Sequence, residues 1–117
     1  MLRGVPVAGR AVLFATGWSR LWRTERYGDP DHPHLTAETA AALVAGGASL
    51  VGIDSVNIDA TAGGDRPAHT ILLGAGIPIV EHLTGLETLI GAPFRFFAVP
   101  VRVRGMGTFP VRAFAVL

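Results

Sequence analysis

The stretch LTAETAAALVAGGASLVGID, residues 35–54, combines a helix with the strand that follows it. Thr36 is a suitable N-cap, and Glu38 lies in the first turn, where the helix dipole favours an acid. The glycine pair Gly46–Gly47 is typical of a helix end. The run SLVGID (49–54) then predicts a buried strand, because it is short, apolar and bounded by small residues.

Apolar runs on either side extend this pattern. RAVLFATG (10–17) predicts a strand before the helix, and a strand–helix–strand order implies a parallel pair with a right-handed crossover. AHTILLGAG (68–76) predicts a short helix, and IPIVEHL (77–83) predicts a third strand. The sequence therefore indicates an α/β fold with a crossover helix.

The remaining segments are a long loop and a hairpin. Residues 18–34 hold both tryptophans and predict a loop with one helical turn. FRFFAVPVRVRG (94–105) alternates apolar and cationic residues, which indicates a strand with one wet face, and Pro100 places it at an edge or a bulge. With FPVRAFAVL (109–117) it forms a predicted antiparallel hairpin, so we expect a mixed sheet.

Composition excludes several classes of function. The 117 residues suffice for one domain, and a hydrophobic content of 50% with only 16% charged residues indicates a folded chain. A net charge of +1 gives no reason to expect a nucleic-acid or membrane partner, and the absence of cysteine excludes thiolate chemistry. No complete glycine fingerprint, P-loop or GxSxG elbow is present. The high apolar content for this length indicates an apolar surface that meets either another chain or a missing part of the same one.

His69 and Glu81 are the strongest candidate site residues. They stand twelve residues apart around an apolar run, and both are suitable ligands for zinc or manganese. Spacing alone leaves two alternatives open, a shared metal or two ordinary polar ends of a strand. An acid directly after IPIV is costly unless it is paired or coordinated. We expect His82 at the surface, because successive strand side chains face opposite sides.

Other polar and aromatic residues offer weaker candidates. Asp54 ends a predicted strand, where ligands gather in open α/β sheets, but we interpret it as a loop cap. Asp59 and Asp65 stand in the polar loop that follows, where Asp59 is expected to shape the loop and Arg66 to pair with either acid. The motif DPDHPH (29–34) does not match a preformed metal site, and we interpret it as a loop on the substrate side. Trp18 and Trp22 are candidates for the wall of a substrate pocket, with a structural aromatic cluster as the alternative.

Four segments in order resemble the second half of the cyclase family, the kynurenine formamidase-like metal-dependent hydrolases. They are VLFATGW, HPHLTAETAAALVAGGASLVGIDSVNID, RPAHTILLGAGIPIVEHLTGLETL and FRFFAVPVRVRGMGTFPVRAFAVL. The most specific parts are GID-S-x-N-I-D and H-x3-L-x-x-G-I-P-I-V-E. The resemblance implies that the fold is the C-terminal part of a swivelling β/β/α domain.

The resemblance also implies roles for single residues. A His and a Glu at this spacing help to hold a divalent metal in the family, which carries over to His69 and Glu81. The family's main motif, H-x-G-T-H-x-D-x-P-x-H, carries the remaining ligands and the catalytic histidine, and this sequence lacks it. We therefore expect residues 1–117 to form a single cyclase-like domain that is incomplete at its N-terminus, and no catalytic residue is assigned within it.

The implied function is metal-dependent hydrolysis of a cyclic or formylated amide, with zinc or manganese as the cofactor. The competing hypothesis is a non-catalytic oligomerisation or binding remnant of the same fold. We expect a small-molecule amide substrate and either a homo-oligomer or a complementing chain. The expected location is the cytoplasm.

Overall fold

A parallel sheet of three strands, in the order β1-β2-β3, organises the larger part of the chain. The computed structural model describes residues 2–117, and its contacts divide the chain after Glu87 into two units, each treated below on its own. No helix in residues 2–117 is long and apolar enough to cross a membrane. The predicted α/β class is confirmed, with the parallel and antiparallel strands in two separate sheets.

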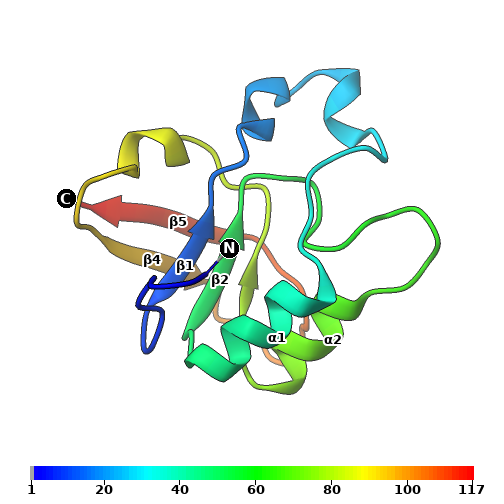
Figure 1. The fold of residues 1–117 in the computed structure, drawn as a ribbon. Coiled ribbons are helices and arrows are strands. Elements are labelled where there is room, and N and C mark those ends of the chain that lie inside the picture. The colour runs from blue at the N-terminus through cyan, green and yellow to red at the C-terminus, as the bar shows by residue number, and fades with distance from the viewer. Residues whose placement is uncertain (1) are drawn as a thin grey trace. The chain divides into compact units, whose positions relative to one another are not determined.

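The strands of the first unit have the predicted direction. Strand β1 (Ala11–Phe14) pairs in parallel with β2 (Leu50–Ile53), with Val12 opposite Val51. Strand β3 (Ile79–Val80) adds to the other edge of β2. Because all three strands run the same way, their carboxyl ends lie at one edge of the sheet (Figure 1).

Helix α1 (Ala37–Gly46) begins and ends as the sequence predicts. The Thr36 side chain accepts a hydrogen bond from the backbone N–H of Thr39, which satisfies one free donor of the first turn. Gly47 ends the helix in the left-handed region, with φ of 78°, and its N–H bonds to carbonyls of the last turn. A glycine adopts this conformation without the steric strain of a Cβ atom.

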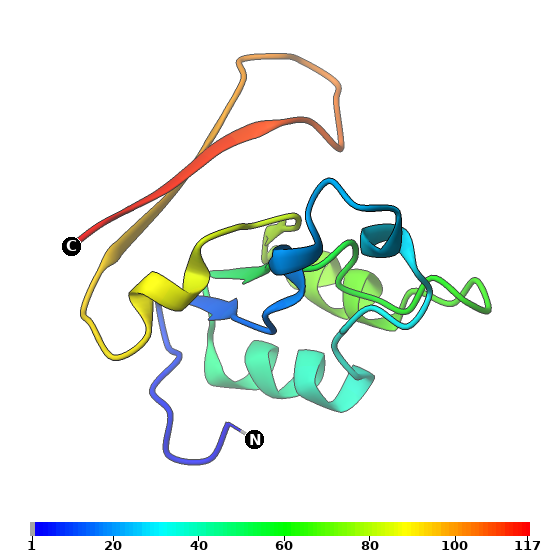
Figure 2. The same ribbon diagram turned by 90° about the horizontal axis from the view of Figure 1, so that it is seen from above.

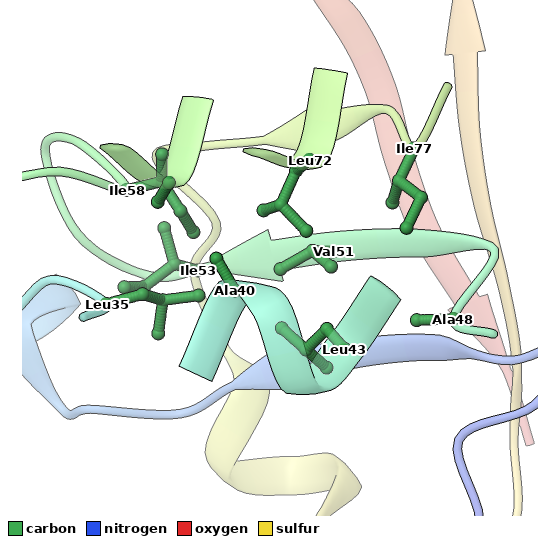
Figure 3. Packing of buried hydrophobic residues seen from close by; sticks show 10 residues of the cluster. Leu35, Ala40, Leu43, Ala48, Val51, Ile53, Ile58, Leu72 and Ile77 are labelled. Atoms are coloured by element: carbon green, nitrogen blue, oxygen red, sulfur yellow. The ribbon is translucent and has the colours of Figure 1, made fainter. Parts of the chain in front are cut away.

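Both helices cover the same face of the parallel sheet (Figures 1 and 2). Helix α2 (Pro67–Gly74) starts with a proline, whose missing N–H costs nothing at the first helical position. Leu43 of α1 and Leu72 of α2 are fully buried and converge on Val51 of the central strand (Figure 3). This cluster is the core of the first unit, and it fixes α2 against the sheet.

The third strand is shorter than the predicted run 77–83. Only Ile79 and Val80 pair with β2, and Glu81 follows directly after them. His82 has φ of 60°, so the chain leaves the extended conformation there. The alternation of Glu81 and His82 across a strand was therefore a wrong prediction, although His82 is exposed as expected.

The long loop before α1 contains more local structure than the single turn predicted. Two 3-10 turns occupy it, η1 (Trp18–Leu21) and η2 (Glu25–Gly28). A third, η3 (Leu86–Leu89), spans the point in the chain at which the two units divide.

The second unit is an antiparallel hairpin. Strand β4 (Arg95–Pro100) pairs with β5 (Val111–Val116), and Phe97 stacks on Phe114 with ring centroids 4.9 Å apart. The predicted strand 94–105 stops early, and the prediction was wrong beyond Pro100. The N–H of Val103 bonds to the carbonyl of Val101, which turns the chain away from the ladder.

Candidate metal centre at the carboxyl ends of the parallel strands

Polar side chains gather where the three parallel strands end. Asp54 follows β2, Glu81 follows β3, and the Thr16–Gly17 turn follows β1. The carboxyl ends of parallel strands are the usual place for ligands in open α/β sheets. Two separate hydrogen-bond networks occupy this edge, one around Asp54 and one around His69.

Asp54 holds the turn that follows β1. Its carboxylate accepts hydrogen bonds from the Thr16 backbone N–H at 2.8 Å, the Thr16 hydroxyl at 2.6 Å and the Gly17 N–H at 3.0 Å. The side chain is buried, and its interactions are those of a loop cap, as the sequence interpretation proposes.

His69 lies in the first turn of α2 and contacts two carboxylates. Its Nδ1 lies 2.7 Å from Oδ2 of Asp59, and its Nε2 lies 3.3 Å from Oε1 of Glu81. Glu81 Oε1 also accepts the Ile58 backbone N–H at 2.9 Å. His69 and Glu81 are thus brought together, as the sequence predicts, and both remain partly exposed.

Asp59 is the buried member of this cluster, and backbone hydrogen bonds hold its carboxylate in place. It is 1% exposed, and its carboxylate accepts the backbone N–H groups of Ala68 at 2.7 Å and His69 at 2.9 Å. Burial alone would raise the pKa of Asp59, but these N–H groups and the His69 ring outweigh it and lower the pKa below its ordinary value. The sequence interpretation gave Asp59 only a role in shaping the loop.

Arg66 completes the surroundings of the His69 ring. Its Nη2 lies 2.9 Å from Nε2 of His69, whereas the sequence suggested an ion pair with Asp59 or Asp65. Arg66 and His69 are only three residues apart, at the start of a helix, so their contact is local. The sequence did not reveal it because Asp59 and Asp65 are equally plausible partners for Arg66.

The donors near His69 do not complete a metal site by themselves. Within residues 2–117, no group of three or more His, Asp or Glu side chains is arranged to hold a metal ion. Nε2 of His69 and Oε1 of Glu81 lie 3.3 Å apart, whereas Asp59 contacts the other ring nitrogen, Nδ1.

The two tryptophans take different positions. Trp18 is buried, at 6% exposure, and its ring N–H donates to the Tyr27 carbonyl at 2.9 Å. Trp22 is 45% exposed and packs edge-on against Tyr27, with ring centroids 5.0 Å apart. Trp18 therefore supports the loop from inside, and only Trp22 presents its ring to a surface.

Tyr27 and His82 extend the aromatic cluster, and the sequence interpretation missed both. The Tyr27 hydroxyl and Nδ1 of His82 lie 3.0 Å apart, and the His82 ring is also near Trp22. Burial raises the pKa of Tyr27, and the negative charges of Asp54 and Glu81 raise it further.

The two histidines of DPDHPH, His32 and His34, form their hydrogen bonds away from His69, Asp59 and Glu81. His32 is 1% exposed and contacts the Ser55 hydroxyl and the Thr61 hydroxyl, each at 3.3 Å. His34 is exposed. This arrangement anchors the loop to the segment after β2, so the motif has a structural contribution that the sequence pattern did not indicate.

The lowered pKa of Asp59 predicts a pH-dependent contribution to stability. In the unfolded chain the group titrates near about 3.9, above its folded pKa, so its contribution is complete above that value and is lost as the pH falls through the folded pKa. We expect the free energy of unfolding of the wild type to exceed that of Asp59→Asn near neutral pH, and this difference to narrow below about pH 4.

Urea unfolding of both proteins at several pH values measures the difference. Asp65→Asn is the matched control, because Asp65 is exposed in the same loop region. A difference between wild type and Asp59→Asn that stays constant from about pH 6 to about pH 3 would contradict the prediction.

Parts of the chain are similar in sequence to known proteins. The cyclase family model matches residues 3–60, which include Asp54 and Asp59 but neither His69 nor Glu81. An uncharacterised protein of Methanocaldococcus jannaschii is 29% identical over 91% of this chain and 53% of its own length. The kynurenine formamidase of Salinibacter ruber is 37% identical over 68% of this chain and 37% of its own.

A second kynurenine formamidase, from Bacillus mycoides, is 31% identical over 80% of this chain and 46% of its own length. The chain thus spans about half, or less, of the curated relatives that it matches. These findings assign the chain, as a partial match, to the cyclase family.

Proposed function

We propose that this chain forms part of a cytoplasmic, metal-dependent hydrolase that acts on a cyclic or formylated amide. The observation that carries the proposal is the 3.3 Å separation between Nε2 of His69 and Oε1 of Glu81. Two donors of one tetrahedral zinc ion, each about 2.1 Å from it, lie roughly 3.4 Å apart. The pair therefore has the spacing of two ligands of a single cation.

The donor types and the relatives support the same reading. An imidazole nitrogen and a carboxylate oxygen suit zinc and manganese equally. When a cation is bound, such a site supplies Lewis-acid polarisation of an amide carbonyl and a more acidic water. Two of the relatives are named kynurenine formamidase, a name that denotes cleavage of a formylated amide, and this supports the proposed substrate class.

The roles of the chain's own residues follow from their positions. His69 and Glu81 would hold the cation, and the Ile58 N–H fixes Oε1 of Glu81, the oxygen that lies 3.3 Å from Nε2 of His69. Trp22 is placed to contact a flat substrate, because its exposed ring stands beside Tyr27 and His82. Trp18 supports this loop from the buried side.

Further donors are needed, because a catalytic zinc takes about three protein ligands. Among residues 2–117 no third side chain joins His69 and Glu81. We therefore propose that another polypeptide segment, in a second copy of the chain or in a complementing chain, completes the site. Metal binding that strengthens as the chain associates supports this, whereas tight binding by an isolated monomer contradicts it.

The test is a titration of the purified chain with Zn²⁺ and with Mn²⁺ by calorimetry. We expect His69→Ala and Glu81→Gln to weaken binding by at least the roughly 10–100-fold that loss of an outer-shell partner costs. His34→Ala is the matched control, because His34 is exposed and has no contact with His69. Equal affinities in wild type and His69→Ala would refute the proposed centre.

The same samples separate the two functional classes. Metal-loaded chain, alone and with a complementing partner, is assayed against a formylated aromatic amine and a cyclic amide. Hydrolysis that both site variants lose supports the enzyme. A chain that binds neither metal but associates stably with itself is a non-catalytic binding module of this fold.

A further inference from the structure

The His69 ring is contacted at both of its nitrogens. On the buried side, Nδ1 lies 2.7 Å from Oδ2 of Asp59. On the other side, Nε2 lies 2.9 Å from Nη2 of Arg66. Since each nitrogen of a neutral imidazole is either a donor or an acceptor, these two partners decide where the proton resides.

The two contacts give the same answer independently. A guanidinium carries only donors, so Nε2 must accept from Arg66. An ionised carboxylate only accepts, so Nδ1 must donate to Asp59. The ring is therefore the Nδ1–H tautomer. Oε1 of Glu81 also lies 3.3 Å from Nε2, but a carboxylate and an unprotonated nitrogen both accept, so the hydrogen bond at Nε2 is the one from Arg66.

Asp59 is itself held rigidly. The Ala68 N–H bonds to Oδ1 and the His69 N–H bonds to Oδ2, so the first turn of α2 fixes both oxygens. The same oxygen that takes the His69 N–H also takes its ring proton. The backbone and side chain of one residue are thus bound to one buried carboxylate, which leaves the ring little freedom to rotate.

We propose that Asp59 is a positioning residue, which fixes His69 as the Nδ1–H tautomer and directs the Nε2 lone pair toward a cation shared with Glu81. A carboxylate behind a histidine ligand commonly sets the tautomer and orientation of that ligand and raises its basicity. The assignment of the tautomer stands on the contacts alone, and only the step to the cation rests on the proposed function. When no cation is bound, Nε2 accepts the hydrogen bond from Arg66.

Asp54 provides an internal comparison. It is buried to the same extent as Asp59 and also accepts two backbone N–H groups, but it contacts the turn after β1 and no histidine. If Asp59 served only to hold backbone, the two residues would be equivalent. The ring contact distinguishes them, so variants at both positions separate positioning from structural support.

The first measurement is the tautomer of His69, read from its ring nitrogen shifts by ¹⁵N NMR without metal. Wild type and Asp54→Asn are expected to show Nδ1–H. The Asp59 variants are made in the Arg66→Ala background, where Asp59 alone selects the tautomer. There the chain with Asp59 is expected to keep Nδ1–H, whereas Asp59→Asn and Asp59→Ala are expected to shift the ring toward Nε2–H, which Glu81 accepts. Circular dichroism verifies that each variant folds. Two substitutions of Asp59 are made so that the test remains possible if one of them does not fold. A ring that keeps Nδ1–H in each folded Asp59 variant overturns the proposal.

The second measurement is Zn²⁺ affinity by calorimetry. Asp59→Asn is expected to bind Zn²⁺ about 10–100-fold more weakly than wild type. In a chain that already carries His69→Ala, Asp59→Asn is expected to cause no further loss of Zn²⁺ affinity, because Asp59 acts on the metal through the His69 ring. A wild type with the Nδ1–H ring that fails to bind Zn²⁺ both alone and with a complementing chain refutes the proposed function and leaves the tautomer assignment standing. Unchanged affinity in Asp59→Asn refutes the positioning role.

Discussion

Replacing Leu72 with alanine is expected to lower the free energy of unfolding by about 2–5 kcal/mol. Leu72 is fully buried and packs with Leu43 and Val51 in the core of the first unit (Figure 3). The change removes apolar contacts and leaves a cavity, and it costs nothing in helix propensity because alanine is the best helix former. Urea unfolding followed by circular dichroism measures the difference.

The neighbouring residue supplies the control. Leu73 lies on the same helix but is 55% exposed, so Leu73→Ala should change the free energy of unfolding by no more than about 0.5 kcal/mol. The Leu72 prediction fails if the two variants are equally stable. A large effect confined to Leu72 would confirm that α2, which carries His69, is held by this one face.

Local signals in the sequence were sufficient for α1 and for the parallel pair. Thr36 caps the helix and Gly47 ends it through contacts within a few residues, so the pattern alone contains the information. The run 49–54 is apolar and short, and the helix before it forces a parallel return. These elements depend little on the rest of the chain.

The elements that sequence patterns misplaced are those in which one residue overrides a regular pattern. Alternation predicts a strand through residue 105, but Pro100 has no N–H to continue the ladder and β4 ends there. The apolar run 77–83 predicts a full strand, yet only Ile79 and Val80 form ladder pairs with β2, and the chain leaves the extended conformation at His82, which is in the left-handed region.

The candidate site was predictable only in part. His69 and Glu81 were found because their spacing resembles that of a family, and the structure places them 3.3 Å apart. The contact of Asp59 with the His69 ring depends on how an irregular loop returns to α2, which no periodic pattern encodes. Tyr27 reaches His82 across 55 residues of sequence for the same reason.

Asp54→Ala is expected to lower the free energy of unfolding by about 2–3 kcal/mol, because hydrogen bonds to a charged group contribute more than neutral ones. The carboxylate accepts three hydrogen bonds from Thr16 and Gly17, and it is the side-chain link between the ends of β1 and β2. Thr16 and Gly17 are exposed, so water can replace part of the hydrogen bonding that the carboxylate provides. This replacement limits the loss in free energy of unfolding.

Hydrogen exchange distinguishes a local loss of hydrogen bonds at Thr16 and Gly17 from a global loss of stability. The amides of Thr16 and Gly17 should exchange faster in Asp54→Ala than global destabilisation requires, because their acceptor is gone, whereas amides of α1 should follow the global change. Asp65→Ala, at an exposed position, should change the free energy of unfolding by no more than about 0.5 kcal/mol. If Asp54→Ala matches that control, the turn before the tryptophan loop does not depend on this carboxylate. The order of the aromatic cluster would then come from the loop's own contacts, chiefly the bond from the Trp18 ring to Tyr27.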